Sequence, residues 1–143
     1  MTGTELETIA PAAFGQSLRG IGVNLLCRDV PGLVAFLGQV FGLAAQRVSA
    51  DFAIIIHAGM LLQLHSDTAF ASHPLHALLP EAGPRGAGVQ LYLFGIDPDT
   101  SAARAEAAGG MVLEPPADKP HGVREATILA PEGQAFSPAV VRA

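Results

Sequence analysis

The chain has 143 residues, about the size of one domain; half of them are apolar and 15% are charged. This composition supplies a hydrophobic core and excludes a disordered chain. The net charge of −5 comes from scattered acidic and basic residues with no run of Lys or Arg, so no nucleic acid partner is expected. No apolar stretch is long enough to span a bilayer, so no membrane partner is expected either.

The location expected from the sequence is the cytoplasm. A single cysteine, Cys27, cannot form an intramolecular disulfide, so nothing indicates an oxidising compartment. Residues 1–17 have neither the basic region nor the apolar core of a signal peptide, and they show no sustained period. We therefore expect them to form a partly ordered arm.

The first structured segment is predicted to be a strand followed by a helix. Residues 20–28 alternate between apolar and small or polar side chains, which indicates a half-buried strand. Asp29 then stands at the N-cap position of a helix whose apolar residues keep helical spacing over 32–41, with Gly42 at its end. Short strands are expected next, near 44–49, at 52–57 and at 60–65.

A similar order returns in the second half of the chain. Residues 66–85 are a polar connection in which one or two helical turns are expected, and residues 87–95 alternate like a strand. A helix is expected from Asp97 to about Ala108, where Gly109 and Gly110 stop it. Further strands are predicted near 111–114, at 122–129 and at 134–140.

The two halves therefore look like copies of one module. Asp29 and Asp97 open the two helices and lie 68 residues apart, and the turn glycines Gly59 and Gly133 also correspond. Each module alone has too little core to be stable, whereas two modules can bury their helix-covered faces and leave a curved sheet facing inward.

Two segments resemble the vicinal oxygen chelate proteins, the glyoxalase/bleomycin resistance/dioxygenase superfamily. These are NLLCRDVPGLVAFLGQVFGL at 24–43 and GVREATILAPEGQAFS at 122–137, although the turn at 130–134 departs from the usual pattern. The resemblance implies an α+β fold of two βαβββ modules forming an open cupped mixed sheet with helices outside, usually in a homodimer. The domain would cover 18–143, with module one at about 18–70, a connection at 71–85 and module two at about 86–141.

The resemblance also locates four metal positions. By the family's spacing they fall at Gly22 and Gln90 on the first strands and at Gln63 and Ser137 on the last strands. A divalent metal prefers imidazole or carboxylate donors, which this set does not supply. We therefore expect no metal and no cofactor at this location. An alternative set of His65, His121 and Glu125 is conceivable, but we interpret these as polar pocket or rim residues.

Strand parity predicts what lines the cavity instead. The inward side chains would be neutral hydrogen-bonding groups and two aromatic rings, with Arg124 from the polar stretch at 117–125 as a further ligand contact. Such a lining suits an uncharged or polyfunctional organic molecule. The predicted ligand-binding residues are Asn24, Gln63, His65, Gln90, Tyr92, Phe94, Arg124 and Ser137. In the alternative, bulky side chains fill a dry core and no pocket exists.

Three functions remain open at this point. The first is a metal-free protein that sequesters a small organic molecule, and the missing metal ligands favour it. The second is a lyase, isomerase or dioxygenase that uses an atypical metal or acid–base set, for which the catalytic candidates are His121, Glu125 and His65. The third is a structural or regulatory module whose sheet serves only for dimerisation. Fold alone cannot choose among them.

Overall fold

The computed structural model describes residues 2–142 of the chain. They form two compact units. Unit 1 holds the chain up to residue 34 together with residues 43–79, and unit 2 holds residues 35–42 together with the chain from residue 80 onward. Among the described residues, no helix has both the length and the apolar character that crossing a bilayer requires.

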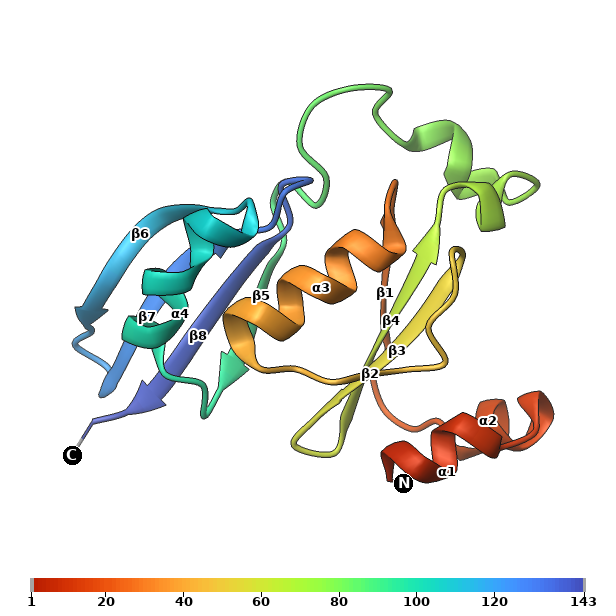
Figure 1. Ribbon diagram of the computed structural model, residues 1–143, viewed down its shortest axis with the longest axis horizontal. Helices are drawn as coiled ribbons and strands as arrows, with labels where there is room; N and C mark the ends of the chain where they lie inside the picture. The colour runs from red at the N-terminus through yellow and green to blue at the C-terminus, as the bar shows by residue number, and fades with distance from the viewer. Residues whose placement is uncertain (1, 143) are drawn as a thin grey trace. The chain divides into compact units, whose positions relative to one another are not determined.

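Unit 1 contains a four-stranded mixed sheet (Figure 1). Its strand order is β1-β4-β3-β2; β1 runs parallel to β4, and the other neighbours are antiparallel. Helix α3 (Val30–Phe41) follows the first strand. The strands are β1 (Val23–Cys27), β2 (Ala45–Gln46), β3 (Phe52–His57) and β4 (Met60–Ser66).

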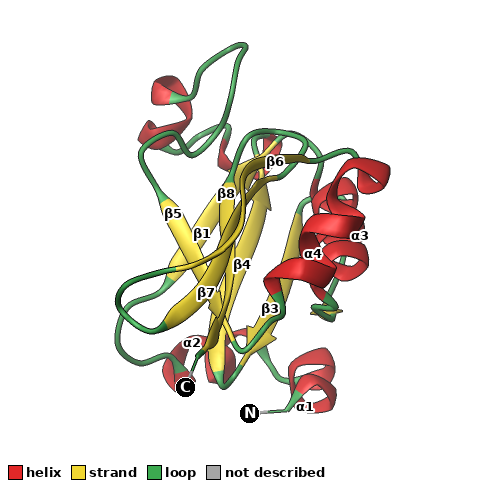
Figure 2. Ribbon diagram, turned by 90° about the vertical axis from the view of Figure 1, so that its left-hand side faces the viewer, coloured by secondary structure: helices red, strands yellow, loops and turns green. Residues whose placement is uncertain are grey.

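Unit 2 repeats this topology with the strand order β5-β8-β7-β6. Helix α4 (Pro98–Ala105) packs on strands β6, β7 and β8 and covers one face of the sheet (Figure 2). The α+β fold of two βαβββ modules is therefore confirmed, and each module has a mixed sheet of its own. The strands are β5 (Gln90–Phe94), β6 (Met111–Asp118), β7 (Val123–Leu129) and β8 (Ala135–Val141).

The two helix-opening aspartates form equivalent caps. Oδ1 of Asp29 accepts a hydrogen bond from the backbone N–H of Gly32 at 3.0 Å, and Oδ2 of Asp97 accepts one from the N–H of Thr100 at 3.1 Å. Each bond satisfies an N–H group that the first turn of a helix leaves unpaired. The Asp positions that aligned the two halves are thus structurally equivalent. Gly42, with φ of 71°, ends α3 in the left-handed conformation, as predicted.

The apolar stripe of α3 is buried, as its helical spacing predicted. In unit 2, the ring of Phe41 packs against Phe136 of β8 with a centroid distance of 5.7 Å, and against Phe36 at 5.9 Å. Gly110 lies so close to Phe36 and to the Leu129 carbonyl that it leaves no room for a Cβ atom. The buried residues of the stripe are Val30, Leu33, Phe36, Leu37, Val40 and Phe41.

The N-terminal arm is helical, which the sequence did not predict. It contains α1 (Gly3–Thr8) and α2 (Pro11–Ser17). A capping box between Thr2 and Glu5 opens α1, and Pro11 opens α2. Both helices are only about two turns long, so no periodicity could reveal them. The capping box of Thr2 and Glu5 is the sequence feature that indicates α1. The connection after β4 holds two short 3-10 helices, η1 (Thr68–Phe70) and η2 (Pro74–Leu78), as expected.

Strand lengths differ from the predictions at β1, β2, β5 and β6; β5 covers only Gln90–Phe94 of the predicted range 87–95. Strand β1 is shorter than 20–28, and β2 ends at Gln46 because the next residue, Arg47, has a positive φ of 52°. Strand β6 runs well beyond 111–114 despite Pro115 and Pro116. It is an edge strand with register shifts at these residues, and such a strand tolerates proline because one side needs no ladder hydrogen bonds.

Candidate functional site

The candidate residues of unit 1 lie together on one face of its sheet. Asn24 of β1 and Gln63 of β4 are neighbours in the parallel register. Side chains alternate along a strand, so Gly22 and His65 lie on this same face. Nδ1 of His65 is 2.6 Å from Oδ1 of Asn24. The structure therefore brings together the three unit 1 residues that were predicted to bind a ligand.

The environment of His65 favours a neutral imidazole. An amide oxygen only accepts hydrogen bonds, so the contact with Asn24 requires the proton on Nδ1 and leaves the lone pair on Nε2. The ring also packs between Phe52, at a centroid distance of 4.9 Å, and Phe70, at 5.2 Å. Burial lowers the pKa of His65 below the ordinary value of 6.5, because the charged form loses hydration. His65 is thus equipped to accept a proton or a hydrogen bond through Nε2.

A groove of about 590 Å³ borders this cluster, and it lies wholly in unit 1. Gly22 and Gln63 line it, and both are positions to which the family resemblance assigned metal ligands. The end of the arm forms one wall, and the β3–β4 hairpin around Gly59 forms the other. The remaining lining residues are Ser17, Leu18, Arg19, Gly20, Ile21, Ile56, Met60 and Leu61. The volume lies within the range of about 300–1,000 Å³ that is typical of small-molecule pockets.

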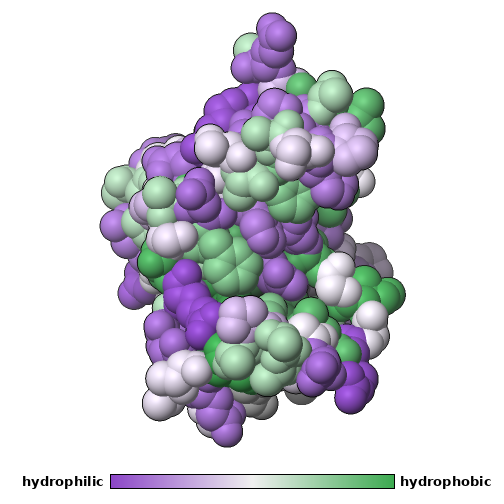
Figure 3. Space-filling model, turned by 90° about the vertical axis from the view of Figure 1, so that its right-hand side faces the viewer, coloured by the Kyte–Doolittle hydropathy of each residue, from purple (hydrophilic) through white to green (hydrophobic). Residues whose placement is uncertain are grey.

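The groove is mainly apolar, which residue parity on the strands alone did not predict. Ile21 and Met60 expose most of their side chains beside it, and Gly22 leaves open space where a side chain would stand. Arg19 is the charged residue of the lining, and its Nη1 already donates to the carbonyls of Gln16 and Leu18. On the side of the molecule that Figure 3 shows, hydrophobic residues form several groups that hydrophilic residues separate.

The unit 2 candidates line the sheet face opposite α4, and we call this the polar face. Nε2 of Gln90 donates to Oγ of Ser137 at 2.7 Å, and Ser137 Oγ lies 3.2 Å from Oγ1 of Thr127. Tyr92, in register with Ser137, stacks on Phe94 with a centroid distance of 5.3 Å and an interplanar angle of 2°. Thr127 was not predicted, although its parity with Glu125 could have indicated it. The polar face comprises Gln90, Tyr92, Phe94, Glu114, Glu125, Thr127 and Ser137.

Two of the catalytic candidates also meet on the polar face. Oε1 of Glu125 lies 3.7 Å from Nε2 of His121, and the carboxyl of Glu125 is buried while the imidazole is mostly exposed. Lys119, in the turn between β6 and β7, forms an ion pair with Glu114. This pair raises the pKa of Lys119, and the negative charge of Glu125 raises it further.

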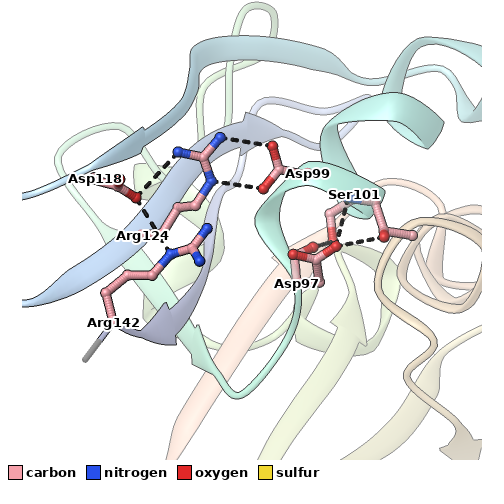
Figure 4. A network of polar contacts seen from close by, with 7 residues as sticks. Asp97, Asp99, Ser101, Asp118, Arg124 and Arg142 are labelled. Atoms are coloured by element: carbon pink, nitrogen blue, oxygen red, sulfur yellow. Dashed lines mark hydrogen bonds and ion pairs between the residues drawn. The ribbon is translucent and has the colours of Figure 1, made fainter.

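Arg124, in contrast, lies on the α4 side of the sheet. Its guanidinium donates two hydrogen bonds to Asp99 of α4, at 2.8 and 2.9 Å, and one to Asp118 at 3.2 Å (Figure 4). Arg142 also pairs with Asp118, at 3.4 Å. Arg124 and Glu125 are successive residues of β7, so their side chains point to opposite faces of the sheet. The predicted ligand contact Arg124 therefore does not lie with Gln90, Tyr92 or Ser137. It braces the helix against the hairpin.

The positions to which the resemblance assigned metal ligands do not fit a metal. Gly22 has no side chain, and Gln63 is a neutral amide. Gln90 and Ser137 hydrogen-bond to each other, and Ser137 is fully buried. None of the four is an imidazole or a carboxylate, the donors that a divalent ion prefers. No cluster of three or more His, Cys, Asp or Glu residues suited to a metal occurs in residues 2–142.

The other candidate residues have structural roles. Cys27 is buried in β1, as expected of a small hydrophobic residue. Nδ1 of His73 accepts a hydrogen bond from the N–H of Leu75 at the start of η2, so this histidine braces the connection.

Solved structures with the same fold support this architecture. No protein-family model and no curated protein matches the chain. A glyoxalase/bleomycin resistance protein/dioxygenase family enzyme from Burkholderia phytofirmans PsJN superposes with a TM-score of 0.68 and 22% identity, over 84% of this chain and 96% of that one. A glyoxalase-related enzyme from Fulvimarina pelagi gives 0.69 and 20%, over 86% and 88%. A glyoxalase/bleomycin resistance protein/dioxygenase from Nocardioides gives 0.63 and 22%, over 92% of each chain.

Proposed function

We propose that this chain, which has the fold of the glyoxalase/bleomycin resistance/dioxygenase proteins, is a metal-free protein that binds and sequesters a small organic molecule. The observation that carries the proposal is the groove of about 590 Å³ along Gly22 and Gln63. Gly22 has no side chain, and Gln63 carries a neutral amide. The space that a bound metal would otherwise occupy at these two positions is therefore available to an organic ligand. The homodimer and the cytoplasmic location stay predictions.

The groove favours a ligand that is largely apolar. Its walls carry Leu18, Ile21, Ile56, Met60 and Leu61, and burial of apolar surface stabilises a complex by about 25 cal/mol per Å². The amide of Gln63 offers an NH2 group that donates and a carbonyl oxygen that accepts, and the Asn24–His65 pair lies next to it on the same sheet face. A few placed polar groups among apolar walls are the usual composition of a small-molecule site.

A substitution at Gly22 tests the proposal. A Cβ atom at Gly22 meets no other atom within 4 Å, and its φ is not in the left-handed region. Gly22→Phe should therefore fold and fill the groove. Gly15→Phe is the matched control, because Gly15 also has open space around it but lies in α2 outside the groove.

The readout is the midpoint of thermal unfolding in a screen of organic compounds. A compound that binds only the folded state must raise this midpoint. We expect compounds that stabilise the wild type and Gly15→Phe and that lose this effect in Gly22→Phe. The proposal fails if no compound stabilises the wild type, or if the stabilising compounds act equally on Gly22→Phe. Native protein that carries about one equivalent of a single metal would contradict the metal-free part.

A second candidate function is acid–base catalysis on a bound molecule, and the Asn24–His65 hydrogen bond favours it. Orientation of an imidazole by a neighbouring side chain is a common feature of general bases. His121 beside Glu125 is the alternative acid–base pair. This function predicts that a compound from the screen is chemically converted, as mass spectrometry would detect, and that His65→Ala or His121→Ala abolishes conversion while affinity remains. An unchanged compound after incubation with the wild type contradicts it.

A further inference from the structure

The groove of unit 1 contains a single charged side chain, that of Arg19. The other lining residues are apolar or neutral, and none of them is a carboxylate. A guanidinium is ionised at any pH at which the protein is folded, so its positive charge is always present. An acidic residue in the wall would pair with this charge, and the lining supplies none. The groove therefore combines apolar walls with one positive charge that a ligand can neutralise.

The side chain of Arg19 is held in place through one of its three nitrogen atoms. Nη1 donates to the carbonyls of Gln16, at 2.8 Å, and of Leu18, at 2.7 Å. These carbonyls lie at the end of α2, where a helix leaves its last carbonyl groups unpaired. The two N–H groups of Nη1 are thereby used, whereas Nε and Nη2 form no hydrogen bond or ion pair with residues 2–142. The guanidinium is thus oriented before a ligand binds, and one of its edges stays available.

The available edge of Arg19 matches a carboxylate. Nε and Nη2 lie side by side in the guanidinium plane, and their parallel N–H groups fit the two oxygen atoms of a carboxylate. One guanidinium balances the charge of one monoanion, whereas a phosphate monoester, with a charge of about −1.5 to −2 at neutral pH, would keep negative charge in excess. The chemistry of this edge therefore favours a carboxylate as the headgroup of the ligand.

The rest of the groove accommodates an apolar body. It follows β4 from Met60 to Gln63, and three residues of a strand span about 10 Å. Ile21 is 88% exposed and Met60 is 71% exposed, so a ligand in contact with them would remove apolar surface from water. The amide of Gln63 forms no hydrogen bond with residues 2–142 and carries no charge. It can orient a polar substituent, but it cannot distinguish an anion from a neutral molecule.

We infer that the groove binds a monocarboxylate with an apolar body, and that Arg19 recognises the carboxylate through Nε and Nη2. This inference rests on the proposed function and names the chemical class of the ligand. The apolar walls supply most of the affinity, and the charge-assisted hydrogen bonds of Arg19 supply the selectivity. The sequence predicted an uncharged or polyfunctional ligand and did not indicate Arg19 as a contact.

Three compounds with the same apolar body test the inference: 4-phenylbutanoate, 4-phenylbutanamide and 4-phenylbutylamine. At neutral pH the first is an anion, the second is neutral and the third is a cation. Binding to the full-length protein is measured by titration calorimetry and by ligand-observed NMR. We expect the anion to bind about fivefold more tightly than the amide, as a well-oriented ion pair that is open to solvent allows, and the amine to bind no more tightly than the amide. Added salt should reduce the advantage of the anion.

Variants of Arg19 assign this preference to its side chain. Arg19→Gln should reduce the affinity for the anion to that for the amide, and an unchanged affinity for the amide shows that the groove is intact. Arg19→Lys keeps the charge without the paired N–H groups, so it should keep only part of the preference. Arg104→Gln removes the same charge from an exposed residue of α4 and should keep the whole preference. Gly22→Phe should weaken the anion and the amide alike, and thermal unfolding shows that each variant is folded.

Equal affinity for the anion and the amide, no binding of the anion to the wild type, or an unchanged preference in Arg19→Gln would overturn the inference. Should Arg19→Gln also lose the amide, the wild type decides, because a preference that salt does not reduce overturns the inference as well. The proposed function is judged separately. If the anion and the amide bind equally and Gly22→Phe weakens both, the groove binds ligands but does not select a carboxylate. If no probe binds and no compound from the screen stabilises the wild type, both proposals fail.

Discussion

Nδ1 of His65 and Oδ1 of Asn24 lie 2.6 Å apart, although 41 residues separate them in the chain. The parallel pairing of β1 with β4 places them on one sheet face, and the amide oxygen fixes which nitrogen carries the proton. This contact gives His65 a defined chemical state before any ligand binds.

The first prediction concerns this tautomer and its pKa. NMR of the imidazole nitrogens should show a proton on Nδ1 in the wild type and a pKa below 6.5, because burial disfavours the charged ring. Asn24→Ala should remove the preference for Nδ1–H, and Asn24→Asp should raise the pKa, because a carboxylate stabilises imidazolium. A wild-type pKa at or above 6.5 would contradict the burial argument.

The same shift predicts a pH dependence of stability. The imidazole of His65 binds a proton less readily in the folded state than in the unfolded state. The free energy of unfolding should therefore have its full value above pH 6.5. It should fall as the pH is lowered from there toward the pKa of His65 in the folded state. His65→Gln should lose this dependence. Urea unfolding between pH 5 and about 8 measures it, and identical profiles for the two proteins would speak against the assignment.

The third prediction concerns the cap of α4. Asp97→Ala should lower the free energy of unfolding by about 1 kcal/mol, because the N–H of Thr100 loses its acceptor. Asp97→Asn is the matched control, since asparagine caps nearly as well. Hydrogen bonds from Thr100 lower the pKa of Asp97 below 3.8, so this contribution is present above pH 3.8 and is lost as the pH falls through the folded pKa. Equal losses in both variants would argue against a capping role.

Gly110 provides a test of packing in unit 2. A Cβ atom there would lie 2.6 Å from the Leu129 carbonyl oxygen and 2.6 Å from Cε2 of Phe36. Gly110→Ala should therefore destabilise the protein by about 1–3 kcal/mol, as overpacking usually does. Gly15→Ala, with open space in the helix α2, should be neutral or stabilising by up to about 1 kcal/mol. Chemical denaturation distinguishes the two, and a neutral Gly110→Ala would show that Phe36 can move.

The arm should depend on Arg47. Nη2 of Arg47 donates to the Ile9 carbonyl at 2.5 Å, between α1 and α2, and its backbone N–H donates to Glu7 at 2.8 Å. Arg47→Ala removes the side-chain bond, so amide hydrogen exchange over residues 3–17 should become faster while exchange in β7 and β8 stays the same. Arg104→Ala, on α4, should leave the arm unchanged. Unaltered exchange in Arg47→Ala would mean that the buried Leu6 holds the arm by itself.

Helix caps and strand parity were predictable because they depend on neighbours in the chain. Asp29 and Asp97 were recognised as caps from the residues that follow them, and both accept the expected hydrogen bonds. The alternation in 87–95 correctly separated Gln90 and Tyr92 from Leu93, which is buried on the other face. Period-two alternation needs no tertiary information, since successive side chains of any strand point to opposite faces.

The candidate site was predictable only in part. The sequence predicted that the side chains of Asn24, His65 and Gln63 face inward. It did not predict that they are neighbours, because that depends on the register of β1 with β4. It also grouped Arg124 with the ligand contacts, whereas Asp99 of α4 holds it on the opposite face. Thr127 was not predicted, although its parity with Glu125 indicates the face on which it lies; its contact with Ser137 arises from the pairing of β7 with β8.

The sequence by itself predicted the repeated strand–helix–strands order and the helix caps, because residue identity and local periodicity decide these features. The resemblance to the glyoxalase/bleomycin resistance/dioxygenase proteins implied the two βαβββ modules and the metal positions, which here hold Gly22, Gln63, Gln90 and Ser137. The tertiary structure alone decided which side chains meet: His65 against Asn24, the residues of the groove between the arm and the β3–β4 hairpin, and His121 beside Glu125. Hydrogen-bonding partners and burial depend on strand register and on the packing of residues far apart in the chain, and neither is encoded in local periodicity.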